Sequence, residues 1–146
     1  MEKTFIYNPE EFNFSCRLYS VESFVRLFNQ NKLIFEECRW STRQCSLFIE
    51  SILIRIPLDV FYIDRTSEKY KIISGSNRLS AIKLILLESY KLEGLEFLTE
   101  LNGLTFQQLS RKYQRRILES DLRIHFINPG TPANIVDNIS RRIQSN

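Results

Sequence analysis

The sequence predicts a single α+β domain. Its 146 residues fit the roughly 100–200 residues of one domain, and because 43% of them are hydrophobic, there is enough apolar surface for a packed core. Along the chain the patterns indicate helix, helix, two strands, helix, a turn-rich connection, strand and helix. With only 4 glycines and 4 prolines, we expect short loops and no linker, so the domain covers residues 1–146.

Two helices are predicted in the first half of the chain. Residues 20–30 begin with Ser20, which can cap a helix, and continue with an apolar stripe. We therefore expect residues 1–30 to be an N-terminal helical extension. The second helix begins after the capping residue Ser41 and ends before Pro57. Its stripe has 3- and 4-residue spacing and consists of Cys45, Phe48, Ile49, Ile52, Leu53 and Ile56.

A strand pair and a buried helix are predicted next. Residues 58–63 and 70–73 are rich in β-branched and aromatic residues, and the polar turn between them favours pairing of the two strands. Both faces of the first strand are apolar, so we expect cover on both sides. Residues 74–78 then lead into a helix over residues 79–87 that has apolar residues on more than one side.

The remaining segment predicts one more strand and a final helix. After a connection interrupted by glycines, we expect short helical turns at residues 106–109 and 112–117. Alternating apolar residues predict a half-buried strand over residues 122–127. The final helix opens with a threonine cap and a proline in the first position, Thr131 and Pro132. Its inner stripe consists of Ile135, Val136, Ile139 and Ile143.

Composition excludes several classes of protein. The longest apolar run, from Leu84 to Leu87, is far shorter than the ~20 residues of a membrane span. The N-terminus lacks the basic region and apolar run of a secretory signal, so we expect a cytoplasmic protein without membrane contact. The net charge of +3 is too small to indicate a nucleic-acid-binding protein unless the basic residues cluster.

Cysteine and histidine give no sign of a disulfide framework or a metal site. The three cysteines, Cys16, Cys38 and Cys45, lack paired CxxC spacing, so we expect reduced thiols. The single histidine, His125, falls on the polar side of a predicted strand, where an ordinary half-exposed residue is expected.

The segment Ser74-Gly75-Ser76-Asn77-Arg78 is the best candidate site. A strand that turns through glycine into a helix leaves backbone N–H groups free, and these groups attract an anion together with the helix dipole. Gly75 allows a ligand to approach the backbone, Ser76 and Asn77 can cap or donate, and Arg78 offers a bidentate fork for phosphate. The same residues are also typical of an ordinary helix start, so the residues alone leave both interpretations open.

Several blocks together resemble a known family. In chain order they are Arg39-Trp40-Ser41 with Gln44, then FIESILIRIPL, FYID, KYKIISGSNRLSAIK, KLEGLEFL, LNGLTFQQL, YQRRILE, and NPGTP before the last helix. Over about residues 31–146 the chain resembles the domain of unknown function 262 family, the N-terminal domain of GmrSD-type restriction proteins. This resemblance implies a ParB/sulfiredoxin-like α+β domain, a small mixed sheet packed with helices, in a bacterial system of phage defence.

The resemblance also implies that the candidate loop binds a nucleoside triphosphate with Mg²⁺ and supports NTPase activity. In the family this loop has the sequence Asp-Gly-Gln-Gln-Arg. Here Ser74 stands at the Asp position and Ser76 and Asn77 stand at the two Gln positions, so that only Gly75 and Arg78 match. A neutral serine neither holds a metal ion nor orients water as an aspartate can. We therefore expect a nucleotide- or phosphate-binding regulatory domain with weak or lost hydrolysis, and assign no catalytic residue.

Four residues near the second helix also fall on family blocks. The resemblance implies that Arg39 and Gln44 face the phosphate loop, that Trp40 lies beside them and that Glu50 is an acid near the loop. In the alternative interpretation, Trp40 is a core aromatic, Gln44 belongs to the first turn of its helix, and Arg39 and Glu50 form a structural ion pair. Both interpretations stay open from the sequence.

A basic run favours a second kind of function. Arg111, Lys112, Arg115 and Arg116 could contact the phosphates of DNA, or they could form a solvated surface. Two further alternatives are a module that binds a protein partner supplying an effector domain, and a degenerate copy of the domain without a ligand.

Overall fold

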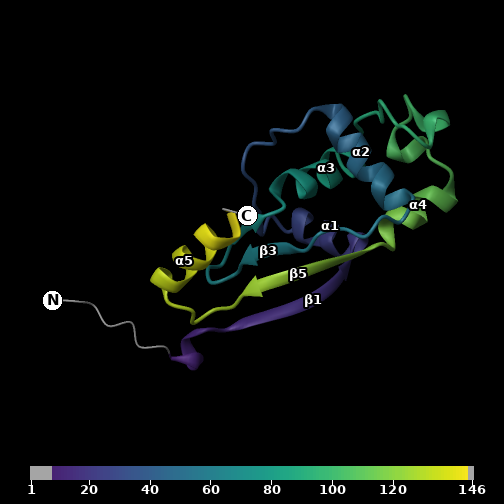
Figure 1. Cartoon of the computed structure of the whole chain (residues 1–146). Coiled ribbons are helices and arrows are strands. Elements are labelled where there is room, and N and C mark those ends of the chain that lie inside the picture. Colours follow the sequence, from purple (N-terminus) through teal and green to yellow (C-terminus); the bar gives the residue numbers. More distant parts are fainter. Residues whose placement is uncertain (1–7, 145–146) are drawn as a thin grey trace.

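The computed structural model describes residues 8–144, apart from the side chain of Phe28. Figure 1 shows the arrangement of its helices and strands. The elements in chain order are η1 Pro9–Glu11, β1 Phe14–Ser20, α1 Val21–Asn29, β2 Leu33–Ile34, α2 Thr42–Leu53, β3 Phe61–Asp64, β4 Tyr70–Ser74, α3 Ser76–Leu86, η2 Thr99–Leu101, η3 Phe106–Gln108, α4 Arg111–Leu118, β5 Asp121–Ile127 and α5 Ala133–Gln144. None of these helices is long and apolar enough to cross a membrane.

The strands form one mixed sheet in the order β1-β5-β3-β4-β2. Strand β1 pairs antiparallel with β5, and β3 pairs antiparallel with β4. The pairs β3–β5 and β2–β4 are parallel. This sheet joins strands from both ends of the described chain, and it confirms the predicted α+β class with a small mixed sheet packed with helices.

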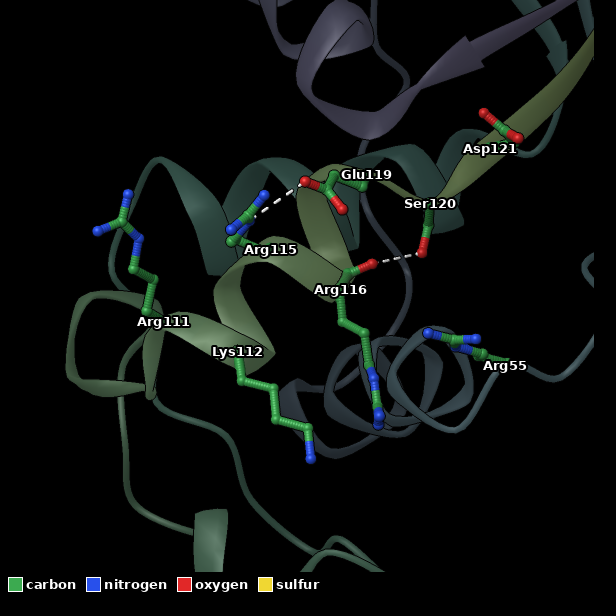
Figure 2. A pocket seen from close by; sticks show the side chains of 8 residues that line it. All are labelled: Arg55, Arg111, Lys112, Arg115, Arg116, Glu119, Ser120 and Asp121. Atoms are coloured by element: carbon green, nitrogen blue, oxygen red, sulfur yellow. Dashed lines mark hydrogen bonds and ion pairs between the residues drawn. The ribbon is translucent and has the colours of Figure 1, made fainter.

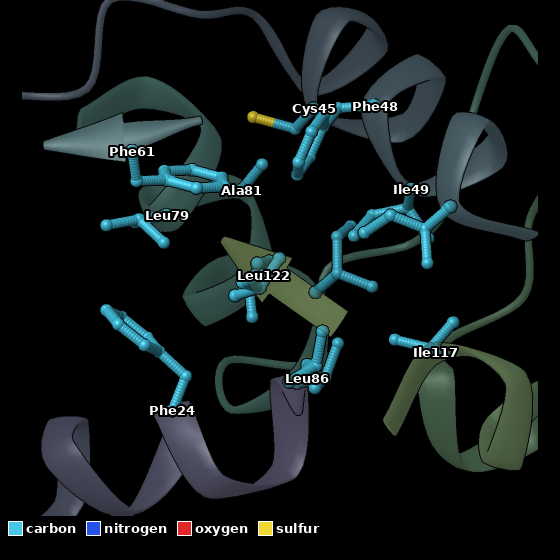
Figure 3. Close-up of a cluster of buried hydrophobic side chains, with 14 of the residues drawn as sticks. Phe24, Cys45, Phe48, Ile49, Phe61, Leu79, Ala81, Leu86, Ile117 and Leu122 are labelled. Carbon is cyan, nitrogen blue, oxygen red and sulfur yellow. The ribbon is translucent and has the colours of Figure 1, made fainter. Parts of the chain in front are cut away.

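The core lies between one face of the sheet and helices α1 to α4. Figure 3 shows side chains from all of these elements meeting in one cluster, among them Phe24 of α1, Phe48 of α2, Phe61 of β3, Ile117 of α4 and Leu122 of β5. Helix α3 is buried on more than one side, as predicted. Its buried residues are Leu79, Ser80, Ala81, Ile82, Ile85 and Leu86.

Helix α5 lies against the other face of the sheet. Tyr62 and His125 belong to that face, because they alternate with the core residues Phe61 and Ile124. Together with apolar residues of α5 they line a hollow of about 680 Å³. Phe61 is fully buried and Tyr62 is half-buried, so the expected cover of β3 on both sides is complete on the core side and partial on the α5 side.

The expected helical extension over residues 1–30 is wrong for part of its length. Residues 14–20 form the edge strand β1, which pairs with β5 along its whole length, while the short 3-10 helix η1 and helix α1 are helical as expected. The apolar residues Phe14, Cys16 and Leu18 alternate with polar ones, which is a strand pattern that the expectation of a helical extension overlooked. These three apolar side chains are exposed. Residues 1–7 lie outside the described residues.

The other predicted elements are confirmed with shifts at their ends. Helix α2 ends at Leu53 rather than at Ile56, because Arg55 adopts a left-handed backbone conformation with φ of 63°. The helical turns predicted at residues 112–117 are part of a complete helix, α4.

Candidate functional site

The candidate loop is the junction between β4 and α3. Strand β4 ends at Ser74, Gly75 follows with φ of 103°, and α3 begins at Ser76. This backbone conformation strains any residue other than glycine, and a Cβ atom added to Gly75 would collide with Cδ1 of the Phe61 ring. The glycine is therefore required by the packing of the turn against β3, whether or not a ligand approaches it.

Helix α3 begins without a side-chain cap. Among the described residues, no acceptor takes the backbone N–H groups of Ser76, Asn77 or Arg78. These donors at the positive end of the helix are available to an anion. The Oγ atom of Ser76 is also buried, with no hydrogen-bond partner in the described part of the chain, although buried polar atoms normally have one. Two kinds of unsatisfied polar group therefore meet at this helix end.

The residues that carry these groups line a hollow of about 410 Å³. Its other wall is the segment before α2, which contributes Glu36, Glu37, Arg39 and Trp40. A further hollow, of about 400 Å³, adjoins it and shares the first and last residues of the loop as lining. The loop thus borders a polar space large enough for a phosphate group and part of the molecule to which the phosphate is attached.

Arg78 is held by the fold. Its guanidinium donates to the carbonyl oxygens of Asp59 and Val60, at 2.6 Å and 3.0 Å, and lies 3.9 Å from the centre of the Phe61 ring. Burial lowers the pKa of Arg78, and the nearby Asp59 carboxylate partly offsets this; the group stays charged, because arginine is not deprotonated in proteins. The expected bidentate fork is therefore only partly available to a phosphate.

Asn77 connects the loop to the segment before α2. Its Oδ1 atom accepts a hydrogen bond from the backbone N–H of Arg39 at 2.9 Å. The Arg39 side chain is exposed and bonds to none of the described residues. Arg39 is therefore the cation at this hollow that is free to meet a ligand.

Gln44 and Trp40 differ in their relation to the hollow. Gln44 closes a capping box at the start of α2, where its Oε1 accepts from the N–H of Ser41 at 2.8 Å and the Ser41 Oγ accepts from the N–H of Gln44 at 3.2 Å. It does not line the hollow. Trp40 both packs against Phe48, with ring centres 5.9 Å apart, and lines the hollow.

Glu50 lies away from the candidate loop and instead binds the backbone of residues 96–98, in the connection after α3. It is 3% exposed, and its carboxylate accepts hydrogen bonds from the N–H groups of Glu96, Phe97 and Leu98 at 2.9 to 3.1 Å. Burial acts to raise the pKa of Glu50, but the three N–H donors outweigh it, so the pKa lies below its ordinary value of 4.5. Glu50 lines neither hollow, and its partners are these backbone groups rather than Arg39.

The cysteines and the histidine have ordinary structural surroundings. Cys45 is buried, and burial, with Cys38 beside it, raises the pKa of its thiol to about 11. Cys16 is exposed. His125 stacks on Tyr62 with ring centres 5.2 Å apart. Within residues 8–144, no three His, Cys, Asp or Glu side chains gather in a way that could hold a metal ion.

The four predicted DNA-contacting residues lie together on α4. Arg111, Lys112, Arg115 and Arg116 line a hollow of about 760 Å³. None of them lines the two hollows at the α3 loop. The basic run and the candidate loop are therefore two separate surfaces.

Three residues that line these hollows were not predicted from the sequence. Glu36 and Glu37 line the hollow with Arg39, and only their closeness to the Arg39 block could have pointed to them. Arg55 joins the four basic residues of α4. The position of Arg55 depends on the left-handed turn at the end of α2, and no glycine marks this turn in the sequence.

Comparison with known proteins identifies no relative, since no family model, no curated protein and no solved structure matches the chain.

Proposed function

We propose that this chain is a phosphate-binding regulatory domain whose ligand, a nucleotide or another phosphate compound, binds at the amino end of α3. The observation that carries the proposal is the uncapped start of α3, where the N–H groups of Ser76, Asn77 and Arg78 have no acceptor among the described residues and border a polar hollow. Free N–H groups at a helix N-terminus form phosphate sites in nucleotide-binding proteins.

The resemblance to GmrSD-type restriction proteins supports the same loop as the binding site. It extends the proposal to a ParB/sulfiredoxin-like fold and to a role in defence against phage. The order of the quoted blocks carries this part of the proposal, and the glycine turn between β4 and α3 fits it.

The charges at the hollow favour an anion that approaches beside Arg39. This side chain is exposed, and Arg78 adds a second, partly buried positive charge. Glu36 and Glu37 line the same hollow, but both are exposed, so solvent screens their repulsion of a phosphate. Mg²⁺ bound to the phosphates of a nucleotide would reduce this repulsion further. We therefore expect magnesium to strengthen the binding of a triphosphate.

Hydrolysis is proposed to be weak or lost. Ser74 stands where the family has an aspartate, and it lines both hollows at the loop. A serine hydroxyl is neutral, so it is a poor ligand for Mg²⁺ and a poor acceptor for a proton from water. The ligand is expected to be bound and released rather than cleaved.

Calorimetric titration tests the proposal. The ligands are inorganic triphosphate, ATP, GTP, CTP and UTP, each with and without Mg²⁺. Arg39→Ala removes the exposed cation of the hollow without changing the core. Arg43→Ala is the matched control, because Arg43 is an exposed arginine whose ion partner is Glu96, 4.0 Å away at the surface. We expect the natural chain to bind, Arg39→Ala to bind about tenfold more weakly, and the control to bind like the natural chain.

Two results would contradict this. The first is the absence of heat and of thermal stabilisation with every ligand at millimolar concentration, which would favour a degenerate domain without a ligand. The second is equal weakening of binding by Arg39→Ala and Arg43→Ala, which would indicate attraction by the overall charge of the protein rather than binding at the α3 hollow.

A further inference from the structure

The hollow between α4 and the end of α2 has a volume of about 760 Å³. Figure 2 shows the side chains around it, which are Arg55, Arg111, Lys112, Arg115, Arg116, Glu119, Ser120 and Asp121. Most of these eight residues are cations and none is apolar. We call this set of residues the basic hollow.

Arg55 occupies a position where helices prefer glycine. At the end of α2, the N–H of Arg55 bonds to the carbonyl of Ile52 at 3.1 Å, and the N–H of Ile56 bonds to the carbonyl of Ser51 at 2.9 Å. This is the Schellman arrangement, whose turning residue is left-handed and usually glycine. Arg55 has φ of 63°, a conformation that costs free energy in a residue with a Cβ atom. The backbone alone does not explain an arginine here.

Arg111 and Lys112 are placed at the unfavourable end of their helix. They form the start of the first turn of α4, which contains no acidic residue. That end carries the positive pole of the helix dipole, where carboxylates stabilise a helix and cations do not. Local electrostatics therefore opposes both residues.

Internal contacts neutralise only part of the basic hollow. Arg115 pairs with Glu119 at 3.3 Å, and Arg116 donates to the carbonyl oxygen of Leu53 at 3.3 Å. The remaining cations have side chains without a hydrogen bond or ion pair to any described residue; they are Arg55, Arg111 and Lys112. Three of the five cations that line the basic hollow thus have no partner within residues 8–144.

We propose that the basic hollow binds the phosphate backbone of a nucleic acid without reading its bases. Arg55 lies at a strained backbone position, and Arg111 and Lys112 lie where the helix dipole disfavours cations. Unpaired cations at such unfavourable positions indicate a ligand with several negative charges. The 8 residues of α4 span about 12 Å, which is the axial rise of about three to four nucleotides of one strand. No lining residue is aromatic or apolar, so the hollow has neither a surface for stacking bases nor the mixed face of a membrane-binding helix.

Fluorescence anisotropy with labelled oligonucleotides tests this proposal. Duplex DNA, duplex RNA and single-stranded DNA of equal length and several sequences are titrated at 50 mM and 200 mM salt. For three phosphate contacts with a duplex we expect a slope of log K against log salt of about −2.7, which is roughly 40-fold weaker binding at the higher salt. Affinity should be independent of sequence, and comparison of the three kinds of oligonucleotide shows which backbone binds best.

Substitutions in the basic hollow test whether it is the surface that contacts the nucleic acid. Arg111→Gln with Lys112→Gln should reduce the salt slope by about two. The matched control is Lys69→Gln with Lys71→Gln, which removes the same charge from exposed residues of another surface and should leave the slope within about one of that of the natural chain. Arg55→Gly should weaken binding while leaving the protein at least as stable, because glycine suits the left-handed turn. A merely structural arginine would not show this combination.

Three outcomes would overturn the proposal. One is no binding of any oligonucleotide at 50 mM salt, and another is equal loss of binding in the control pair. The third is binding to phosphatidylserine vesicles in the absence of nucleic-acid binding, which would assign the hollow to a membrane surface. Because this site is separate from the α3 loop, Arg39→Ala should bind nucleic acid like the natural chain, so failure at one site is distinguishable from failure at the other.

Discussion

Arg78 connects α3 to the segment before β3. A strand, a glycine turn and an arginine predict an anion site from sequence alone. The structure adds that this arginine also satisfies the carbonyls of Asp59 and Val60 and covers the Phe61 ring. No pattern near Arg78 could reveal this, because its partners lie almost twenty residues earlier in the chain. The side chain therefore has a structural role that exists without a ligand.

Replacement of Arg78 should destabilise the fold. Arg78→Ala loses two charged hydrogen bonds and the contact with Phe61, which we expect to lower the free energy of unfolding by about 2–4 kcal/mol. Arg78→Lys keeps the charge but not the planar fork, and it should fall between the alanine variant and the natural chain. Urea unfolding measures both, with Arg39→Ala as a control that changes stability by less than about 0.5 kcal/mol. An Arg78→Ala variant as stable as this control would refute the structural role.

The Glu50 carboxylate makes stability depend on acid pH. Its folded pKa lies below its ordinary value of 4.5, so its stabilisation is fully present above that value and is lost as the pH falls through the lower folded pKa. Glu50→Gln removes the charge that three N–H groups share. We expect it to lower the free energy of unfolding by about 2–4 kcal/mol at pH 7.

The pH dependence separates this effect from simple loss of packing. In urea unfolding between pH 7 and pH 3, the difference between the natural chain and Glu50→Gln should shrink as the acid range is reached. A difference that stays constant over this range would show that the charge of Glu50 does not stabilise the connection after α3.

The turn between β4 and α3 requires glycine at position 75. Gly75→Ala introduces a Cβ atom at φ of 103° and against the Phe61 ring. Conformational strain and overpacking together should cost about 2–4 kcal/mol, measured by urea unfolding. Gly130→Ala is the control, because its φ of 95° gives similar strain with nothing within 4 Å of the added atom. Equal losses in the two variants would show that contact with Phe61 adds nothing.

The helices could be predicted more completely than the strands. Apolar stripes with capping residues identified α1, α2 and α5, because one-sided burial leaves a periodic pattern. Strand β1 was missed although Phe14, Cys16 and Leu18 alternate with polar residues, because the pattern is short, its apolar side chains are exposed and the strand is defined by its pairing with β5. The early end of α2 was also missed, because Arg55 stands where glycine would have marked the turn.

On the scale of the whole molecule, the sheet order decides what meets at each surface. The order β1-β5-β3-β4-β2 depends on pairings between segments that are distant in sequence, which local patterns do not contain. The loop at α3 could be predicted as a candidate site, since strand, turn and helix are consecutive. Glu36 and Glu37 could not be placed beside it, because the hydrogen bond between Asn77 and Arg39 brings their segment there.

The proposed loss of hydrolysis can be tested by restoring one acid. Ser74 is half-buried and lines both hollows at the loop, so Ser74→Asp places a carboxylate beside a bound triphosphate. We expect a Mg²⁺-dependent release of phosphate at least about tenfold above the natural chain. Ser74→Asn is the control with the same shape and no charge. Equal rates in the two variants would show that the missing acid is not what limits hydrolysis.

The most direct test of the phosphate site is a ¹H–¹⁵N correlation spectrum of the natural chain during titration with inorganic triphosphate. We expect the backbone amide signals of Ser76, Asn77 and Arg78 to shift most, because their N–H groups gain an acceptor that the described chain does not supply. If these three signals stay in place at saturating ligand, or if the shifts are confined to α4, phosphate does not bind at the amino end of α3.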